Sequence, residues 1–171
     1  MIDKVQIVDN VLPDNLHKMC YELILAEKVW CLDQHSAPGA IRIAGSTIFD
    51  FERNIDMGCR SQALATVIYQ MVKVKVPHLS DDVRRIQLGA KAAFQKDVIH
   101  TDHKDSDRTT VLFFLNKNWK KEWGGDTMVD GKMYEYKPNR ALVYPSNLLH
   151  GGEGGTGSEF RSYINFVSKN D

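Results

Sequence analysis

Residues 83–115, VRRIQLGAKAAFQKDVIHTDHKDSDRTTVLFFL, begin the part of the chain that decides the fold. From here to the C-terminus, short runs rich in β-branched and aromatic residues are separated by turns, which is typical of β-strands. Asp130-Gly131, between two of these runs, is a dipeptide typical of a tight β-hairpin. So many short strands predict a mainly β fold, a sandwich or jelly roll. The predicted strands are Val83–Leu88, Ala92–His100, Thr109–Leu115, Thr127–Val129, Met133–Tyr136, Arg140–Tyr144 and Ser162–Val167.

The N-terminal part of the chain is predicted to supply one short strand and two helices that flank this β core. Val5–Val8 alternates as a strand does. Asp14 to about Lys28 follows Pro13 with apolar residues at helical spacing, and Ser61–Val76 does the same until Pro77 ends it. The apolar stripes are Leu16, Cys20, Leu23 and Ala26 on the first helix, and Leu64, Val67, Ile68, Met71 and Val74 on the second.

At 171 residues, the chain has the length of one ordinary domain. We therefore expect a single domain over residues 1–171. Residues 1–80 would hold the strand and supporting helices, and residues 81–171 the jelly-roll core with the functional site. Trp30–Gly58 is long and irregular, which fits either a substrate-binding flap or a surface excursion without a function.

The composition gives no sign of a nucleic-acid or membrane partner. Lys plus Arg equals Asp plus Glu at 22 each, so the formal net charge is zero. No apolar run has the length of a membrane span, and the N-terminus lacks the hydrophobic core of a signal peptide. The widely spaced Cys20, Cys31 and Cys59 fit reduced thiols in a cytosol better than a disulfide framework.

His100-Thr101-Asp102 is the first candidate for chemistry. Successive side chains on a strand point to opposite faces, so His100 and Asp102 project together. An imidazole and a carboxylate on one face are two of the three donors of an open 2-His-1-carboxylate iron(II) site. His150 follows an apolar strand and precedes Gly151-Gly152, and in a jelly roll it can meet them as the third ligand. The alternative for His150 is a polar residue at the mouth of a loop.

Arg161 begins the last predicted strand, and a period of two places it on one face with Tyr163 and Asn165. If this face points into the barrel, the guanidinium is buried and must find an anion. The planar fork of arginine suits a carboxylate. The alternative is an arginine at the rim, paired with Glu153 or Glu159.

Five features in this order, His100-Thr101-Asp102, Leu115-Asn116, Trp123-Gly124-Gly125, His150 and Arg161, resemble the iron(II)/2-oxoglutarate dioxygenases of the prolyl 4-hydroxylase type. The stretch from about residue 87 to residue 167 also resembles the small single-domain members found in phages and marine bacteria. The resemblance implies a double-stranded β-helix, with His100, Asp102 and His150 as iron ligands. It makes Arg161 the partner of the distal carboxylate of 2-oxoglutarate. The implied cofactors are Fe(II) and 2-oxoglutarate, with ascorbate in a supporting role.

One departure from the family pattern concerns the cosubstrate. Relatives often place a tyrosine before the Leu-Asn pair, where its hydroxyl helps to bind 2-oxoglutarate, but this chain has Phe114 there. Thr110, on the same face by a period of two, or Gln87 is expected to supply a hydrogen bond instead. Asn165, which shares a face with Arg161, is a further expected contact of the cosubstrate.

The resemblance implies hydroxylation of prolyl residues in a peptide or protein, although a small-molecule substrate stays open. We expect no catalytic residue beyond the metal ligands, and a location in a bacterial or phage-infected host cytosol. Two alternatives are a zinc-dependent hydrolase on the same three ligands and a non-catalytic jelly-roll binding module. Arg161 argues against hydrolysis, because that reaction needs no buried anchor for a cosubstrate. Substrate determinants are expected in Trp30–Gly58, Lys104–Arg108 and Lys117–Trp123.

Overall fold

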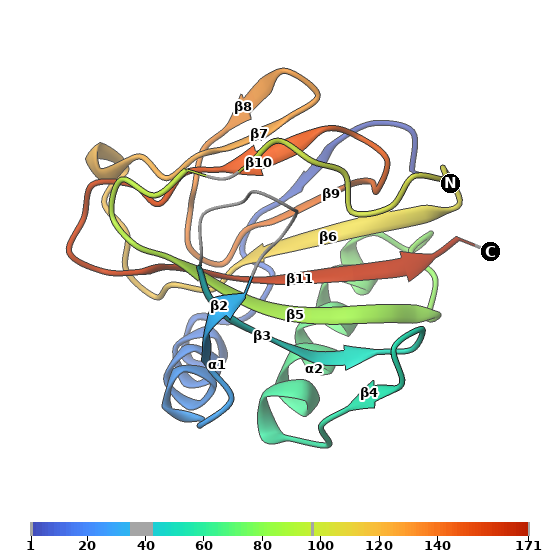
Figure 1. Cartoon of the computed structure of the whole chain (residues 1–171), viewed down its shortest axis with the longest axis horizontal. Helices are drawn as coiled ribbons and strands as arrows, with labels where there is room; N and C mark the ends of the chain where they lie inside the picture. The colour runs from blue at the N-terminus through green and yellow to red at the C-terminus, as the bar shows by residue number, and fades with distance from the viewer. Residues whose placement is uncertain (1, 35–42, 97, 171) are drawn as a thin grey trace.

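The computed structural model describes residues 2–34, 43–96 and 98–170. In this part of the chain, two antiparallel sheets face each other (Figure 1). The larger sheet has the strand order β1-β9-β6-β11-β5-β3-β2, with β4 paired to β3, and the smaller has the order β10-β7-β8. The predicted mainly β jelly roll with flanking helices is confirmed. The strands are β1 Gln6–Val8, β2 Cys31–Gln34, β3 Ile43–Asp50, β4 Ile55–Asp56, β5 Val83–Lys91, β6 Arg108–Phe114, β7 Thr127–Val129, β8 Lys132–Tyr134, β9 Ala141–Pro145, β10 His150–Gly152 and β11 Arg161–Lys169.

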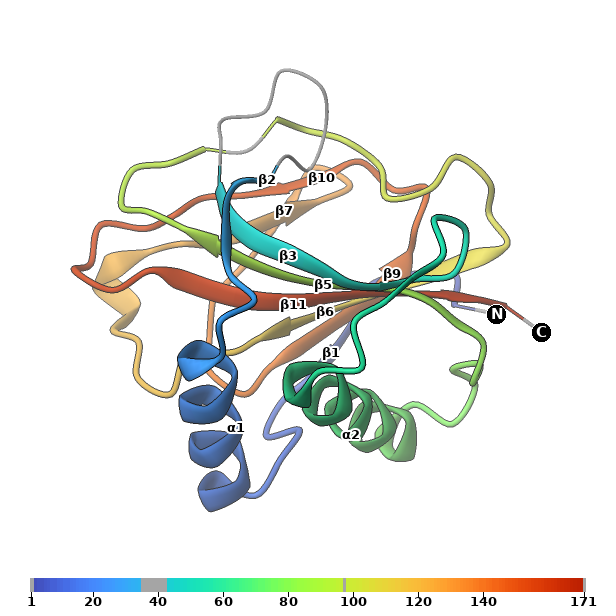
Figure 2. The same ribbon diagram turned by 60° about the horizontal axis from the view of Figure 1, so that its bottom comes forward.

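The two faces of the larger sheet have different partners. Helices α1 (Asp14–Ala26) and α2 (Arg60–Lys75) cover one face, and β7 and β10 of the smaller sheet lie over the other (Figure 2). On β11, Ile164 and Phe166 are buried in the apolar core on the helix side. Arg161, Tyr163 and Asn165 line a cavity on the opposite side, as the period of two predicts. The helices thus support a sheet whose other face holds the polar site.

Helix α2 lies where it was predicted, but its buried face is rotated from the predicted stripe. Val67 and Val74 are 46% and 75% exposed. Ile68 is buried as predicted, and Leu64 and Met71 pack partly buried against the core. Tyr69 is also buried, because its hydroxyl donates a hydrogen bond to the Ser80 carbonyl at 2.7 Å. The buried residues of α2 are Ser61, Ala65, Ile68, Tyr69 and Val72.

The buried face of helix α1 also differs from its predicted apolar stripe, but by less. Cys20 is buried as predicted, whereas Ala26 is exposed and Ile24 and His17 are buried instead. Burial lowers the pKa of His17 below its ordinary value, and the ring Nε2 lies 3.0 Å from the Leu115 carbonyl. A neutral imidazole therefore substitutes for an apolar side chain in this helix. Within the described ranges, the chain has no helix long and apolar enough to cross a membrane.

The predicted strand Ala92–His100 is wrong. β5 extends to Lys91, and the chain then turns, with the Gln95 amide donating to the Ala92 carbonyl at 3.2 Å. Phe94 has φ +61°, which a strand does not allow. Further along, His100 forms only an isolated bridge, with His150. The apolar residues of this segment imitate a strand, but the turn at Phe94 interrupts the pairing.

The hairpin predicted at Asp130-Gly131 joins β7 to β8. The two residues have φ +49° and φ +74°, which is the left-handed pair that a tight type I′ turn requires. The registers Thr127↔Tyr134 and Val129↔Lys132 follow from this turn. The prediction of the hairpin is therefore confirmed.

Much of Trp30–Gly58 belongs to the larger sheet. It contributes β2, β3 and β4, and β3 contains the predicted strand Thr47–Phe49 and pairs with β5. Residues 35–42, with most of the predicted strand Ile41–Ile43, lie outside the described residues. The flap hypothesis for this segment stays a prediction.

Candidate metal and cosubstrate site

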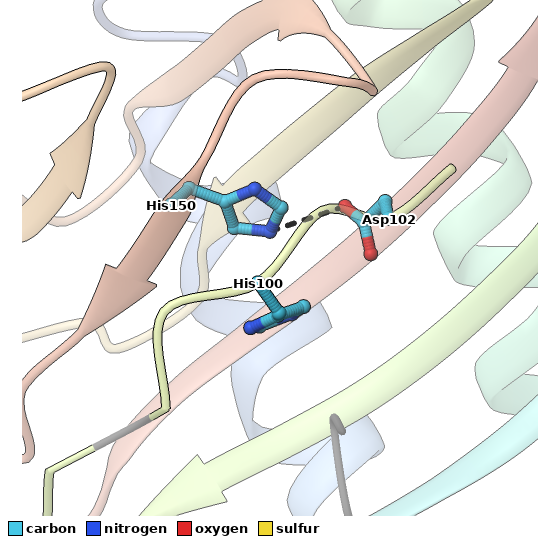
Figure 3. A group of neighbouring side chains, drawn as sticks. All are labelled: His100, Asp102 and His150. Carbon is cyan, nitrogen blue, oxygen red and sulfur yellow. Dashed lines mark ion pairs between the residues drawn. The ribbon is translucent and has the colours of Figure 1, made fainter. Parts of the chain in front are cut away.

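His100, Asp102 and His150 come from segments far apart in the sequence, and their side chains converge (Figure 3). Each offers one ligand atom, and these atoms all lie within 4.8 Å of one another. The backbone fixes this arrangement. The His100 amide donates to the His150 carbonyl at 3.0 Å, and the His150 amide donates to the His100 carbonyl at 2.8 Å. The Asp102 amide is held in turn by the Ser146 carbonyl at 3.0 Å.

Both imidazoles are oriented in the same way. His100 Nδ1 lies 2.8 Å from the Val98 carbonyl, and His150 Nδ1 lies 3.0 Å from the Leu148 carbonyl. A carbonyl accepts only, so we assign the proton of each neutral ring to Nδ1. Each Nε2 then carries a lone pair. Histidines that bind a metal through one ring nitrogen usually donate the N–H of the other nitrogen to a protein acceptor, as both rings do here. The Nε2 of His150 lies 3.4 Å from Asp102 Oδ2, close to the separation of about 3 Å expected for two ligands of one ion.

The Asp102 carboxylate is the anionic member of the group, and its side chain is only 5% exposed. Burial by itself raises the pKa of Asp102. The positive charge of Arg85 and the hydrogen bond from Asn165 outweigh burial and hold that pKa well below its ordinary value. Arg85 donates to Oδ1, while Thr110 Oγ1 and Asn165 Nδ2 donate to Oδ2 at 2.9 Å and 3.0 Å. The carboxylate is therefore ionised and fixed in place at neutral pH.

A cavity with an empty volume of about 480 Å³, open to solvent, lies beside the three donors. Arg161 lines it and is 1% exposed. Its Nε donates to the Gly125 carbonyl and its Nη2 to Thr127 Oγ1, both at 2.6 Å. The alternative of a rim arginine is therefore wrong. The two acids suggested as its partners lie elsewhere, since Glu153 faces Lys96 and Glu159 lies near the side-chain amide of Asn116.

Aromatic rings surround the guanidinium. Its carbon lies 4.8 Å from the centroid of Tyr136 and 5.3 Å from those of Phe114 and Tyr163, distances at which the ring faces attract a cation. Gly152 leaves room on another side, because a Cβ there would stand 3.3 Å from two guanidinium nitrogens. The rings and the two hydrogen bonds thus hold the guanidinium in place on the cavity wall.

Of the three polar residues predicted to contact the cosubstrate, two line the cavity and one does not. Thr110 Oγ1 binds Asp102 and Ser146, so its hydroxyl serves the carboxylate rather than the cavity. Gln87 and Asn165 both line the cavity. The Gln87 amide also donates to Thr47 Oγ1 at 3.0 Å, and Asn165 donates to Asp102.

Four further residues of the site were not found from the sequence. Arg85 binds Asp102, Thr127 binds Arg161, and Lys91 and Tyr144 line the cavity. The hydroxyl of Tyr144 is buried and has no hydrogen-bond partner within the described part of the chain. A signal existed for Lys91, which shares a face with Gln87 by a period of two. Arg85 shares that face too, but its contact with Asp102 depends on how a distant loop lies over the sheet.

The donor set fits iron(II). Two imidazoles and one carboxylate approach from one side and leave further coordination positions open, which is the facial arrangement of non-haem iron(II) oxygenases. Arg161 lines the same cavity and can receive an anionic group of a cosubstrate. The arrangement can therefore hold a metal and an anionic organic molecule together.

Comparison with known proteins agrees with this chemistry. The family model described as 2OG-Fe(II) oxygenase superfamily matches residues 83–166, a range that contains the three donors and Arg161. A sequence comparison with curated proteins finds no match.

Solved structures share the fold at low sequence identity. A viral collagen prolyl hydroxylase from Paramecium bursaria chlorella virus-1, in complex with 2-oxoglutarate, aligns with a TM-score of 0.65 and 13% identity over 96% of each chain. A prolyl hydroxylase from Trichoplax adhaerens, bound to a peptide fragment of hypoxia-inducible factor, aligns with a TM-score of 0.68 and 15% identity, over 97% of this chain and 83% of that one. HygX from Streptomyces hygroscopicus, with nickel, 2-oxoglutarate and hygromycin B bound, has a TM-score of 0.68 and 10% identity, over 97% and 82%. The part of the chain that holds the site, residues 83–166, belongs to the 2OG-Fe(II) oxygenase superfamily, and the enzyme is an iron(II)- and 2-oxoglutarate-dependent dioxygenase.

Proposed function

We propose that this enzyme hydroxylates prolyl residues in a peptide or protein. In this proposal, His100, Asp102 and His150 hold the iron, and Arg161 binds the distal carboxylate of 2-oxoglutarate. The observation that carries the site assignment is the buried guanidinium of Arg161 in the cavity that the three donors also line. The prolyl substrate is supported by the similarity to two prolyl hydroxylases, one of them a viral enzyme of matching length.

The cofactors supply the oxidation, in which 2-oxoglutarate and dioxygen are converted to succinate and carbon dioxide while one oxygen atom enters a substrate C–H bond. The protein holds and orients the reactants. Asp102 stays ionised because Arg85 and Asn165 bind it, so it attracts a cation without first losing a proton. The rings of Phe114 and Tyr163 keep water away from Arg161, which strengthens its attraction for a carboxylate.

Exposed apolar side chains lie next to both histidines in the sequence. Ile99, which precedes His100, is 48% exposed, and Leu149, which precedes His150, is 56% exposed. Proline has an apolar ring and no backbone N–H, so a proline-containing peptide suits an apolar contact surface that offers few hydrogen bonds. These two side chains support a peptide substrate for the proposed reaction.

The test is a screen of proline-containing peptides with the iron-loaded enzyme and 2-oxoglutarate. We expect at least one peptide to gain one oxygen atom by mass spectrometry, with release of succinate in equal amount. The matched control replaces the modified proline by alanine, which must abolish both signals. If proline peptides neither gain oxygen nor stimulate succinate release, while a small molecule such as an aminoglycoside does both, the prolyl assignment is wrong.

Tyr144 gives a prediction on cosubstrate binding. Burial raises the pKa of Tyr144 well above its ordinary value, so its hydroxyl is a hydrogen-bond donor at neutral pH. We propose that this hydroxyl serves the cosubstrate in place of the one missing at Phe114. Tyr144→Phe should then weaken 2-oxoglutarate binding about threefold to tenfold, the usual range for one neutral hydrogen bond.

The same substitution should not destabilise the protein without ligand, because it removes a buried hydroxyl that lacks a partner among the described residues. Calorimetric binding and thermal unfolding measure the two effects. Tyr134→Phe is the control, since Tyr134 does not line the cavity. An unchanged 2-oxoglutarate affinity in Tyr144→Phe contradicts the prediction.

A further inference from the structure

A hollow on the helix side of the larger sheet, which we call the α1 hollow, is separate from the cavity beside the three donors. It is open to solvent, has an empty volume of about 820 Å³ and shares no lining residue with that cavity. Its floor is a row of small residues, since Ala90 of β5 pairs with Ala44 of β3 and with Ser162 of β11. Two residues further along these strands, the same face carries the large core residues Leu88 and Ile164. The side chains of the sheet thus become small at the end over which α1 lies, and this leaves the hollow (Figure 2).

Three aromatic side chains from separate segments line the α1 hollow. Tyr21 belongs to α1, Trp30 follows that helix, and Phe160 precedes β11. Tyr21 and Trp30 pack partly buried against the apolar core, and the Trp30 indole N–H donates to the Ile24 carbonyl at 3.0 Å. Phe160 is 60% exposed, so its ring borders the hollow without being part of the core. The hollow is therefore an aromatic surface with at least one ring held in a fixed orientation.

Glu159 is the only charged residue that lines the α1 hollow. Among the described residues it forms no ion pair, and the side-chain amide of Asn116 lies 3.4 Å from Glu159 Oε2, which is long for a hydrogen bond. The negative charge of Glu159 adds to burial in raising the pKa of Tyr21, so the carboxylate lies close to that ring. The hollow thus combines aromatic walls with one negative charge.

A lysine outside the α1 hollow offsets this charge only in part. The ammonium group of Lys117 forms an ion pair with Glu22 at 2.9 Å and lies 5.7 Å from the centroid of the Tyr21 ring. It also attracts Glu159, but it does not line the hollow. Glu22 therefore takes up most of the charge of Lys117, and a cation inside the hollow would still be attracted by Glu159.

We propose that the α1 hollow binds an organic cation, an ammonium or guanidinium group carried on an apolar stem. The aromatic rings attract the cation through their faces, and Glu159 supplies the opposite charge. The small residues of the floor leave room for the apolar stem. An anion would be repelled by Glu159, and a neutral ligand would gain nothing from its charge. The cation belongs either to a small molecule or to a basic side chain of a peptide, and the experiment distinguishes these two sources.

The experiment compares two ligands of the same shape. Choline carries a quaternary ammonium group, and 3,3-dimethylbutan-1-ol has a carbon atom in place of the charged nitrogen. The full chain with Zn(II), which is diamagnetic, is titrated with each ligand while the indole N–H signal of Trp30 is followed by NMR. We expect choline to shift this signal to saturation and to bind about tenfold more tightly than the alcohol. The indole signal of Trp119, which does not line the hollow, should stay in place.

Substitutions in the α1 hollow test the role of each part. Glu159→Gln should weaken choline binding about threefold to fivefold and leave the alcohol within about twofold, because only the cation loses an ion pair. Phe160→Leu should weaken choline binding about twofold to fivefold by removing one ring face. The matched control is Glu153→Gln, which changes an acid that pairs with Lys96 and does not line the hollow. Equal affinities for choline and the alcohol, or an unchanged ratio of the two in Glu159→Gln, overturn the proposal.

A second pair of ligands identifies the source of the cation. N-acetyl-lysine amide is compared with N-acetyl-norleucine amide, which lacks the ammonium group. If the lysine derivative binds more tightly than choline and depends on Glu159, the hollow receives a basic side chain of a peptide. If choline binds more tightly, the ligand is a small organic cation. If neither cation shifts the Trp30 signal, the proposal is wrong. None of these measurements uses turnover or 2-oxoglutarate, so their outcome is independent of the proposed function.

Discussion

His150→Ala is expected to reduce Fe(II) affinity by at least about a hundredfold, since even the loss of a residue that supports a ligand costs tenfold to a hundredfold. Succinate release from 2-oxoglutarate should fall below detection. The imidazole is one of three donors whose ligand atoms lie within 4.8 Å of one another, and the described structure shows no other donor that replaces it within that group. Equilibrium dialysis with metal analysis measures the affinity, and a succinate assay measures the turnover.

The control for this prediction is His103→Ala. His103 lies one residue after Asp102, and its ring accepts a hydrogen bond from the Asp105 amide rather than joining the three donors. This variant should keep both metal affinity and succinate release. The backbone hydrogen bonds between residues 100 and 150 do not depend on the imidazole, so His150→Ala should remain folded. A folded His150→Ala protein that binds Fe(II) as tightly as the parent places the metal elsewhere.

Arg161→Gln is expected to raise the KM for 2-oxoglutarate about a hundredfold to a thousandfold, because a carboxylate loses two hydrogen bonds to a charged fork. The turnover number at saturating cosubstrate should fall much less, since the metal donors are untouched. The KM of Arg161→Lys should lie between those of the parent enzyme and Arg161→Gln, because lysine keeps the charge but lacks the planar fork. Initial rates of succinate release at varied 2-oxoglutarate separate KM from kcat.

The Fe(II) affinity of Arg161→Gln shows whether its weaker use of 2-oxoglutarate is specific. Arg161 also binds the Gly125 carbonyl and Thr127, so its replacement disturbs the cavity wall as well as the cosubstrate contact. A specific effect leaves Fe(II) affinity within about threefold of the parent value, well inside the range for loss of a metal-supporting residue. A KM that stays constant in a folded Arg161→Gln protein means that another group anchors the oxoacid.

The strand faces were predictable from the sequence because they depend on local alternation. Arg161, Tyr163 and Asn165 alternate with Ile164 and Phe166, and a strand between two layers must turn these sets to opposite sides. The Asp130-Gly131 hairpin was predictable for a similar reason. Left-handed backbone at two successive positions selects a few residue types.

The predictions were wrong where a local turn or a contact between distant segments, rather than the pattern of apolar residues, decides the structure. The buried face of α2 includes Ser61 and Tyr69, which hydrophobicity alone does not select, and Tyr69 is buried because the Ser80 carbonyl accepts its hydroxyl. Residues 92–100 have strand-like composition, yet a local turn leaves them mostly unpaired. The contact between Arg85 and Asp102 depends on a loop folding back over β5, and sequence spacing does not show that.

The proposed metal site is assembled before any ion binds, because reciprocal backbone hydrogen bonds join His100 and His150. A chelator should therefore strip the metal and leave the fold intact, unlike zinc fingers, which unfold without their ion. A site of two imidazoles and one carboxylate also does not favour iron by affinity, because nickel and copper bind such donors more tightly than ferrous iron. We therefore expect enzyme expressed in medium poor in iron to carry other divalent metals, which metal analysis of the purified protein measures.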